Sequence, residues 1–270
     1  MSPTLKDIDI YCRHMILLHS FILGIVEGIT EFLPISSTGH LILASELLKI
    51  PPSEFLKSFE ITIQLGAIAA VVVYYFKEFF NIETLKKLAV GFIPTGIIGL
   101  LLYKILKTYL LGNSYIVLSM LFLGGIALIV FELLHTENES TPQGIEHIGY
   151  RQSLIVGLFQ SIAIIPGVSR SAATILGGLL VGIPRATIVE FSFLLAVPTM
   201  AAATGLDLLK NAAAFSGANV LPLAVGFITS FVVALLSITF LLAFTRKHTF
   251  IPFGIYRIAV AIAFWLLVLR

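Results

Sequence analysis

The chain has 270 residues, of which 58% are hydrophobic and only 12% are charged, and its mean hydropathy is +1.02. Average soluble domains are about 45–50% apolar and about 25% charged, so this composition indicates an integral membrane protein and excludes a soluble enzyme or a disordered chain. The net charge of +2, with no run of basic residues between aromatic ones, argues against a nucleic-acid partner. The single cysteine, Cys12, excludes an internal disulfide.

Apolar segments follow one another along the chain, and a membrane-spanning helix needs about 20 such residues. Continuous runs of this kind are not the alternating pattern of a membrane β-barrel. Six segments are long enough to span: 59–76, 88–106, 115–134, 188–208, 219–244 and 251–269. The other four form two pairs broken by Pro34 and by Pro166: 15–33 with 35–48, and 153–165 with 168–182. Because proline interrupts a helix, and non-helical backbone at membrane depth must be buried in protein or line a wet cavity, each pair predicts a re-entrant helical hairpin.

The two halves of the chain resemble each other at nearly constant spacing. Three motifs recur: Gly24-x-x-Glu27 as Gly157-x-x-Gln160, Pro34-Ile35-Ser36-Ser37 as Pro166-Gly167-Val168-Ser169, and Gly91-Phe92-Ile93 as Gly226-Phe227-Ile228. We therefore expect a single membrane domain over 1–270, with repeat one at about 15–134, a polar linker at about 135–152 and repeat two at about 153–270. Since each half has three spans and one hairpin, the second half enters from the opposite face. This predicts inverted-topology repeats whose hairpin tips meet near the midplane.

Charged and aromatic residues outside the hairpins give weaker expectations. Six Lys or Arg fall on one face of the predicted topology, against roughly five on the other, so we take the first face as cytoplasmic: Lys77, Lys86, Lys87, Arg151, Arg246 and Lys247. Glu132 is expected to be solvated and Arg185 to lie at the membrane interface, while Tyr256 and Arg257 suit interface anchoring.

The first hairpin carries two acidic residues, Glu27 and Glu31, at membrane depth. An ionisable group there costs roughly 2.5–3.5 kcal/mol on insertion scales, so it is a functional hypothesis by default. A spacing of four residues puts both carboxylates on one helix face, where they repel each other unless a proton or cation lies between them. Hard oxygen ligands suit Mg²⁺ or Ca²⁺, so the pair is a candidate metal site. The alternative is that one or both are protonated or point into the headgroups.

A polar run follows the Pro34 break: Ser36, Ser37, Thr38 and His40. Hydroxyls and backbone N–H groups at a helix N-terminus favour an anion, so this run is a candidate phosphate site. His40 lies one turn after Ser37, where an imidazole could exchange a proton with a hydroxyl. The simpler reading is that one of the hydroxyls only caps the helix.

The tip of the second hairpin contains Arg170 among three hydroxyl residues, Ser169, Ser171 and Thr174. A guanidinium group can hold a phosphate with two parallel hydrogen bonds, and the hydroxyls add neutral donors. The alternative is that Arg170 neutralises Glu27 or Glu31 across the repeat interface, and the two interpretations are compatible.

The two tips resemble the signatures of a known family. The stretch from Gly24 to His40, GIVEGITEFLPISSTGH, is similar to the first signature of the BacA-type undecaprenyl-diphosphate phosphatases. The stretch from Pro166 to Thr174, PGVSRSAAT, is similar to their second. The resemblance implies a plasma (inner) membrane enzyme that hydrolyses undecaprenyl diphosphate to undecaprenyl phosphate and inorganic phosphate, which recycles the lipid carrier for cell-wall synthesis. It also implies inverted repeats, a homodimer, a divalent cation, an active site open to the outer face and a contribution to bacitracin resistance.

Carried over by position, the resemblance makes Ser37 the nucleophile and Arg170 the group that holds the phosphate. Glu27 and Glu31 would bind the cation or accept the serine proton, and His40 would be an acid or base. The oxyanion site would be lined by Ser36, Ser169, Ser171 and Thr174. A histidine nucleophile assisted by serine stays open. So does a different class of function, a secondary transporter or flippase for a polyprenyl phosphate lipid, because broken helices in inverted repeats are a transporter architecture.

Overall fold

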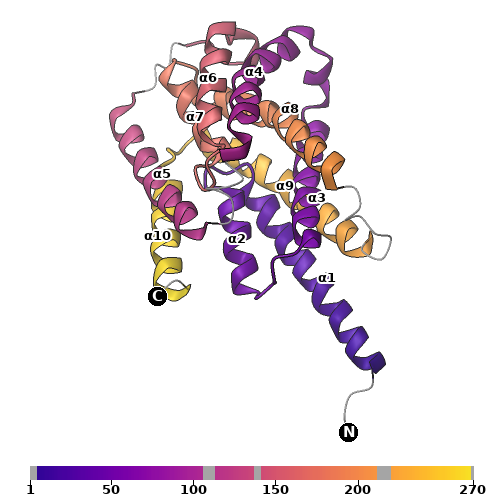
Figure 1. The fold of residues 1–270 in the computed structure, drawn as a ribbon. Helices are drawn as coiled ribbons and strands as arrows, with labels where there is room; N and C mark the ends of the chain where they lie inside the picture. Colours follow the sequence, from indigo (N-terminus) through magenta and orange to yellow (C-terminus); the bar gives the residue numbers. More distant parts are fainter. Residues whose placement is uncertain (1–4, 106–112, 137–140, 212–219, 269–270) are drawn as a thin grey trace.

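A computed structural model describes residues 5–105, 113–136, 141–211 and 220–268, and over these ranges the chain is entirely helical, without a strand (Figure 1). Residues 137–140 of the predicted linker lie outside the described ranges. The α-helices are α1 (Leu5–Thr30), α2 (Ser37–Leu47), α3 (Glu54–Tyr74), α4 (Ile82–Ile105), α5 (Ser114–Leu134), α6 (Tyr150–Ile162), α7 (Arg170–Leu180), α8 (Arg185–Asn211), α9 (Val220–Thr245) and α10 (Ile251–Val268). Two short 3₁₀ helices, η1 (Phe76–Phe80) and η3 (Ile145–His147), lie in connections.

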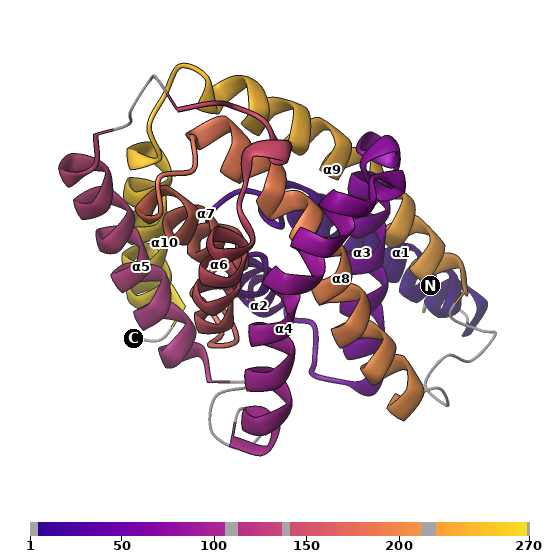
Figure 2. The same ribbon diagram turned by 90° about the horizontal axis from the view of Figure 1, so that it is seen from above.

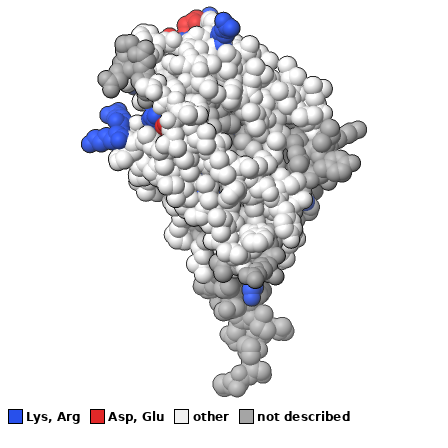
Figure 3. All heavy atoms as spheres, turned by 90° about the vertical axis from the view of Figure 1, so that its left-hand side faces the viewer, with Lys and Arg blue, Asp and Glu red and all other residues white. Residues whose placement is uncertain are grey.

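Five of the described helices are long and apolar enough to cross a membrane, in parts of α3, α4, α5, α8 and α9. The predicted sixth span gives α10, whose apolar stretch Ile251–Leu266 is shorter than the roughly 20 residues that a span requires. The surface agrees with a lipid environment, since Leu100, Leu101 and Leu133 are each more than two-thirds exposed. Figure 3 shows a wide middle zone almost without charged residues. The chain is therefore a helical, multi-pass membrane protein.

Helices α1, α2, α6 and α7 form two hairpins that enter the molecule from opposite ends, and α1, with 26 residues, is much longer than the other three. In Figure 1, α1 rises from the bottom and α2 returns downward, while α6 descends from the top and α7 returns upward. The loops that join them lie in the middle of the molecule, and Figure 2 places α2, α6 and α7 at its centre. We call residues 31–36 the first tip and residues 163–169 the second tip. Pro34 and Pro166 lie in these tips, as the sequence predicts.

Matching glycines of the two halves pack each hairpin onto a long helix of the other half. Helix α1 packs along α9, where a Cβ added to Gly24 would lie 2.8 Å from the carbonyl oxygen of Gly226. Helix α6 packs along α4, where a Cβ added to Gly157 would lie 2.0 Å from the carbonyl oxygen of Gly91. These four glycines are the pairs that the sequence repeat matches, and small residues let membrane helices approach closely. The halves are thus interleaved.

The structure changes the match between the two tips by one residue. Ser36 and Ser169 are the N-caps of α2 and α7, and each side chain accepts a hydrogen bond from the backbone N–H three residues later. Ser36 therefore corresponds to Ser169, and Ser37 corresponds to Arg170, whereas the sequence motif pairs Ser37 with Ser169. The reason is that the second tip has one more residue between its proline and its cap.

Two arginines and a glutamate that we expected near water are buried inside the protein. Glu132 accepts hydrogen bonds from both terminal nitrogens of Arg185 and from the backbone N–H of Phe250, which ties α5 to α8 and to the start of α10. Arg257 has no exposed surface, so its predicted role as an interface anchor is wrong. Hydropathy could not show this, because a buried arginine and an interfacial one occupy similar places in an apolar segment.

Candidate active site

A pocket of about 250 Å³ lies where the two tips meet. Six of the predicted site residues line it: Glu31, Ser36, Ser37, Thr38, Ser169 and Arg170. The other polar groups of its wall come from four further helices, α3, α4, α6 and α8: Gln64, Thr95, Gln160 and Thr199. The two hairpins, far apart in sequence, therefore supply one shared polar site.

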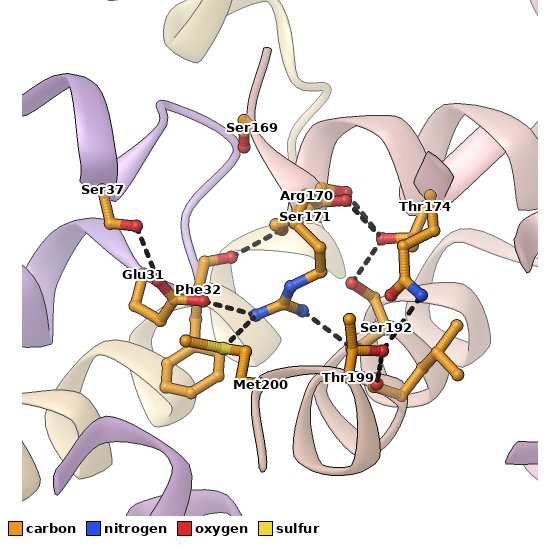
Figure 4. A network of polar contacts seen from close by, with 12 residues as sticks. Glu31, Phe32, Ser37, Ser169, Arg170, Ser171, Thr174, Ser192, Thr199 and Met200 are labelled. Atoms are coloured by element: carbon orange, nitrogen blue, oxygen red, sulfur yellow. Dashed lines mark hydrogen bonds and ion pairs between the residues drawn. The ribbon is translucent and has the colours of Figure 1, made fainter. Parts of the chain in front are cut away.

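A single carboxylate joins the two tips. The hydroxyl of Ser37 donates to Oε2 of Glu31 over 2.6 Å, and Nη2 of Arg170 donates to Oε1 over 2.7 Å (Figure 4). Nη1 of Arg170 donates to the backbone carbonyl of Ser192 over 2.9 Å. Glu31 thus binds a hydroxyl and a guanidinium at once, so the predicted neutralisation of an acidic residue by Arg170 is present, with Glu31 as its partner.

Glu27 lies one helical turn before Glu31, because the backbone N–H of Glu31 still bonds the carbonyl of Glu27 at 2.9 Å. Its side chain has no exposed surface, and neither carboxylate oxygen has a hydrogen-bond partner among the described residues. The Nε atom of Arg170 is also buried and without a partner there. Glu27 is not among the residues that line the pocket, and, like Nε of Arg170, it keeps hydrogen-bonding capacity that buried polar atoms normally use.

The donor set at Glu27 and Glu31 fits a hard cation, which prefers carboxylate oxygens. In the described part of the chain no group of three or more His, Cys, Asp and Glu side chains could hold a metal ion. A cation at this place would therefore complete its coordination with oxygens of a substrate or of water.

Two of the predicted phosphate ligands are used inside the protein. Ser171 donates to the carbonyl of Phe32 over 2.7 Å and so ties α7 to the first tip. Thr174 bonds Ser192 over 2.7 Å and the carbonyls of Arg170 and Ser171. Both side chains are fully buried and neither lines the pocket. Their part in phosphate binding stays a prediction, and the contacts seen here support the position of Arg170.

Both ring nitrogens of His40 have partners other than the Ser37 hydroxyl. Its Nδ1 bonds the carbonyl of Ser36 at 2.8 Å, and its Nε2 bonds the hydroxyl of Tyr256 at 2.9 Å. Because a carbonyl oxygen only accepts, Nδ1 carries the proton and Nε2 accepts from Tyr256. His40 does not line the pocket, so the structure does not bring it to the serine. A role for it as acid, base or nucleophile stays a prediction without a supporting contact.

The sequence analysis missed part of the pocket wall. Nε2 of Gln160 donates to Thr95 over 2.9 Å and to Thr199 over 3.0 Å, which forms a neutral polar wall beside the second tip. The repeat carried a signal for Gln160, since it matches Glu27 of the first half. Thr95 and Thr199 are isolated polar residues in apolar segments, and no sequence pattern marks them as part of a site.

A larger cavity of about 470 Å³ lies between α1, α3 and the start of α9. Its lining is mainly apolar, with Leu23, Phe55 and Phe59 among its residues, and it contains none of the predicted site residues. Cavity volume alone therefore does not identify the active site, and the smaller polar pocket between the tips is the better candidate for it.

Comparisons with known proteins agree with the tip signatures. The family model of the bacitracin resistance protein BacA matches residues 20–263. A protein of Sulfurihydrogenibium sp. named undecaprenyl-diphosphatase is 52% identical over 93% of this chain and 99% of its own length. Proteins of that name from Wolinella succinogenes and Aquifex aeolicus are each 50% identical, over 93% and 90% of this chain and 97% and 95% of their own lengths. Over nearly its whole length, this chain belongs to the BacA family.

Proposed function

We propose that this protein hydrolyses undecaprenyl diphosphate to undecaprenyl phosphate and inorganic phosphate. The observation that carries the proposal is the Ser37–Glu31–Arg170 chain of hydrogen bonds inside the pocket between the tips. It joins a nucleophile and a phosphate-binding cation through one proton acceptor, which each of them contacts directly. The names of the relatives, which share about half of the sequence, support the same activity.

Ser37 is the nucleophile in this mechanism and Glu31 is its base. The serine oxygen attacks the terminal phosphorus while its proton passes to Glu31, 2.6 Å away. The bond from that phosphorus to the bridging oxygen breaks, and the lipid monophosphate leaves with the proton from Glu31. Water then attacks the phosphoserine, Glu31 takes one proton from this water, and inorganic phosphate leaves as the proton returns to Ser37.

Arg170 stabilises the charge that spreads over the phosphoryl oxygens during transfer, as arginines do in such reactions. It can keep its bond to the Ser192 carbonyl while two of its nitrogens turn to a phosphate oxygen: Nε, which has no partner, and Nη2, which bonds Glu31 in this structure. Glu27 and Glu31 would hold the divalent cation. When bound, the cation offsets the negative charge of the diphosphate. Ser36, Thr38 and Ser169 are further hydroxyls of the pocket, close to the tips, that can donate to phosphate.

The pocket takes the diphosphate and leaves the lipid tail in the bilayer. Its volume of about 250 Å³ is below the range of roughly 300–1,000 Å³ that is usual for drug-sized ligands, so a polyprenyl chain does not fit. The apolar faces of the surrounding helices can hold the tail next to the lipid. We propose that the hairpins are re-entrant, that the halves are inverted-topology repeats, and that two copies form a homodimer.

The orientation follows from charge. Helices α4 and α6 begin at the end of the molecule opposite the start of α1 (Figure 1), and Lys86, Lys87 and Arg151 belong to the first residues of these two helices. By the positive-inside rule we propose that this end faces the cytoplasm, in the inner membrane, and that the pocket opens to the outer face.

The test is phosphate release by the purified protein in detergent, with undecaprenyl diphosphate as substrate. We expect one inorganic phosphate and one lipid monophosphate per turnover, and a loss of several orders of magnitude in Ser37→Ala. The control is Ser53→Ala, which removes the hydroxyl that caps α3. A cap contributes only about 1 kcal/mol, so this variant keeps its turnover per folded molecule. A flippase or transporter of the same architecture would release no phosphate, and that result would end the proposal.

A further inference from the structure

The most completely bonded side chain in the described structure is Arg257 in the middle of α10. Its guanidinium group has five N–H donors, and each of them bonds a backbone carbonyl oxygen. Nε donates to Leu121, Nη1 to Pro34 and Val168, and Nη2 to Met120 and Gly167, over 2.9 to 3.3 Å. Arg257 therefore contacts both tips and α5 at once, from a position without solvent exposure.

Helix α5 is shaped to admit this side chain. A Cβ added to Gly124 would lie 2.1 Å from Nη2 and 2.7 Å from Cζ of Arg257. No larger residue fits there without moving the guanidinium group. The α5–α10 contact is thus built around the arginine, whereas a leucine at position 257 would have suited an ordinary apolar interface.

The carbonyls that Arg257 holds come just before two strained residues. Ser36 has a φ of +74° and Ser169 a φ of +77°, in a region that residues other than glycine rarely occupy. Such backbone persists only where its surroundings hold it. Pro34 stands two residues before Ser36, while Gly167 and Val168 directly precede Ser169, so one side chain restrains both strained caps.

These restraints also set the direction of backbone donors near the pocket. In a planar trans peptide the C=O and the N–H point in opposite directions. When Val168 turns its carbonyl to Arg257, the N–H of Ser169 points the other way. Ser169 lines the pocket, and the next residue is Arg170, whose side chain bonds Glu31.

The neighbour of Arg257 supports the first tip in a second way. The hydroxyl of Tyr256 bonds Nε2 of His40 at 2.9 Å, and Nδ1 of His40 bonds the carbonyl of Ser36 at 2.8 Å. This chain ends on the peptide that precedes Ser37. Two adjacent residues of α10 thus hold the peptide group directly before Ser37 and, in the second tip, the peptide group before Ser169, one residue short of Arg170.

We propose that Arg257, assisted by Tyr256, is a positioning residue of the phosphatase: it locks the two tips in the geometry that places Ser37 and Arg170 on the same carboxylate. The inference rests on the proposed function for its kinetic consequences, whereas the locking of the tips can be measured without turnover. Arg257 touches no pocket space itself, so it acts through the backbone of the tips. It should therefore change the rate of the chemical step more than the binding of substrate.

The experiment compares Arg257→Lys, Gly124→Ala and Tyr256→Phe with the matched control Arg185→Lys. Lysine at 257 keeps the charge but has three donors for five carbonyls. Alanine at 124 displaces the guanidinium and leaves all charges unchanged. Arg185 is also buried and hydrogen bonded, and it binds Glu132, which accepts in addition from the backbone N–H of Phe250 just before α10. Its variant reports what the loss of a buried arginine does to the fold alone.

We expect kcat per folded molecule to fall at least 30-fold in Arg257→Lys, at least 10-fold in Gly124→Ala and three- to tenfold in Tyr256→Phe. KM should stay within threefold of wild type, and Arg185→Lys should keep kcat within twofold. Backbone amides of 33–40 and 166–173 should exchange hydrogen at least tenfold faster in Arg257→Lys than in Arg185→Lys, since exchange reports local opening.

The outcomes separate the two proposals. If wild-type protein releases no phosphate, the proposed function fails, and amide exchange in the tips alone decides the role of Arg257. The positioning role is overturned if Arg257→Lys and Gly124→Ala have the same kcat and the same amide exchange rates in the tips as Arg185→Lys. A fall in kcat without faster exchange would also overturn it. If Arg257→Lys does not fold, the tenfold increase in amide exchange is required of Gly124→Ala instead. The kcat of Tyr256→Phe is then the kinetic test, because this substitution changes a residue that is 43% exposed.

Discussion

Glu31→Gln is the sharpest test of the site, because one carboxylate serves both the nucleophile and the arginine. The substitution is isosteric and leaves the side chain able to accept one hydrogen bond, but it removes the negative charge and the proton acceptor. Loss of a general base costs typically 10²–10⁴ in rate, so we expect kcat to fall by about that factor. The Ser37 contact at 2.6 Å is short, as expected for a hydroxyl bonded to a charged acceptor, and it should lengthen in the variant.

Stability should fall as well, since the change leaves Arg170 without its ion-pair partner. Breaking a fully buried pair costs about 3–5 kcal/mol. The side chains of Glu31 and Arg170 are 5% and 12% exposed, and Arg170 keeps its bond to Ser192, so we expect about 2 kcal/mol. In the double variant Glu31→Gln with Arg170→Gln most of this loss should be recovered, because the uncompensated charge is gone, whereas turnover should stay low.

The surface of the protein offers a matched control. Glu83 accepts hydrogen bonds from the hydroxyl of Tyr150 over 2.6 Å and from Lys86 over 2.7 Å, the same two kinds of donor at the same distances as Glu31. These side chains are exposed, and exposed pairs contribute little. Glu83→Gln should leave thermal unfolding and phosphate release unchanged. Our assignment of the base is refuted if Glu31→Gln, folded to the same extent, retains a tenth of wild-type kcat.

Three further predictions concern other parts of the site and its scaffold. Arg170→Lys should lower kcat nearly as much as Arg170→Ala, because lysine loses the planar pair of donors, and a silent Arg170→Lys in phosphate release would leave Arg170 only a structural role. Glu27→Gln should raise the concentration of Mg²⁺ or Ca²⁺ needed for half-maximal activity, and a lower maximum with an unshifted midpoint in a cation titration would speak against metal binding. Gly157→Ala should destabilise the protein by about 1–3 kcal/mol in thermal unfolding, because its Cβ meets the Gly91 carbonyl, while Gly205→Ala, with open space around it, should not.

Much of the fold could be predicted because it depends on local signals. Prolines, apolar runs and capping serines determine the backbone within a few residues of their own positions. The hairpins, their tips and the long spans can therefore be predicted from the sequence. The pairing of Glu31 with Arg170 could be proposed because each charge lies at membrane depth and needs an opposite partner. The repeat also identified the glycines at which the halves interlock, although which helices those glycines would join was not evident.

Other features depend on distant contacts that no local pattern encodes. His40 stands one turn after Ser37, yet Tyr256 draws its ring away from the pocket, and that tyrosine belongs to the last helix. Arg257 resembles an interfacial arginine in sequence, and only the convergence of five carbonyls from three segments explains its burial. Likewise, the one-residue difference between the tips was hidden because motif matching aligned the wrong serines.

The corrected register shows how two halves with matching motifs can give an asymmetric site. Positions that shape the backbone are the same in both halves: serine caps both α2 and α7, and glycines interlock both hairpins with their partner helices. Positions at the pocket differ, since Ser37 corresponds to Arg170 and Glu27 corresponds to Gln160. In phosphoryl transfer the attacking and leaving oxygens lie in line on opposite sides of the phosphorus, while a cation binds the oxygens between them, so the two tips must supply different groups. The chemistry therefore requires the pocket positions to differ, while the fold requires the capping positions to agree. Exchanging Ser37 with Arg170 in a double variant keeps the net charge and should abolish turnover, because the short side chain of a serine at 170 cannot reach Glu31, which Arg170 contacts only through its terminal nitrogen.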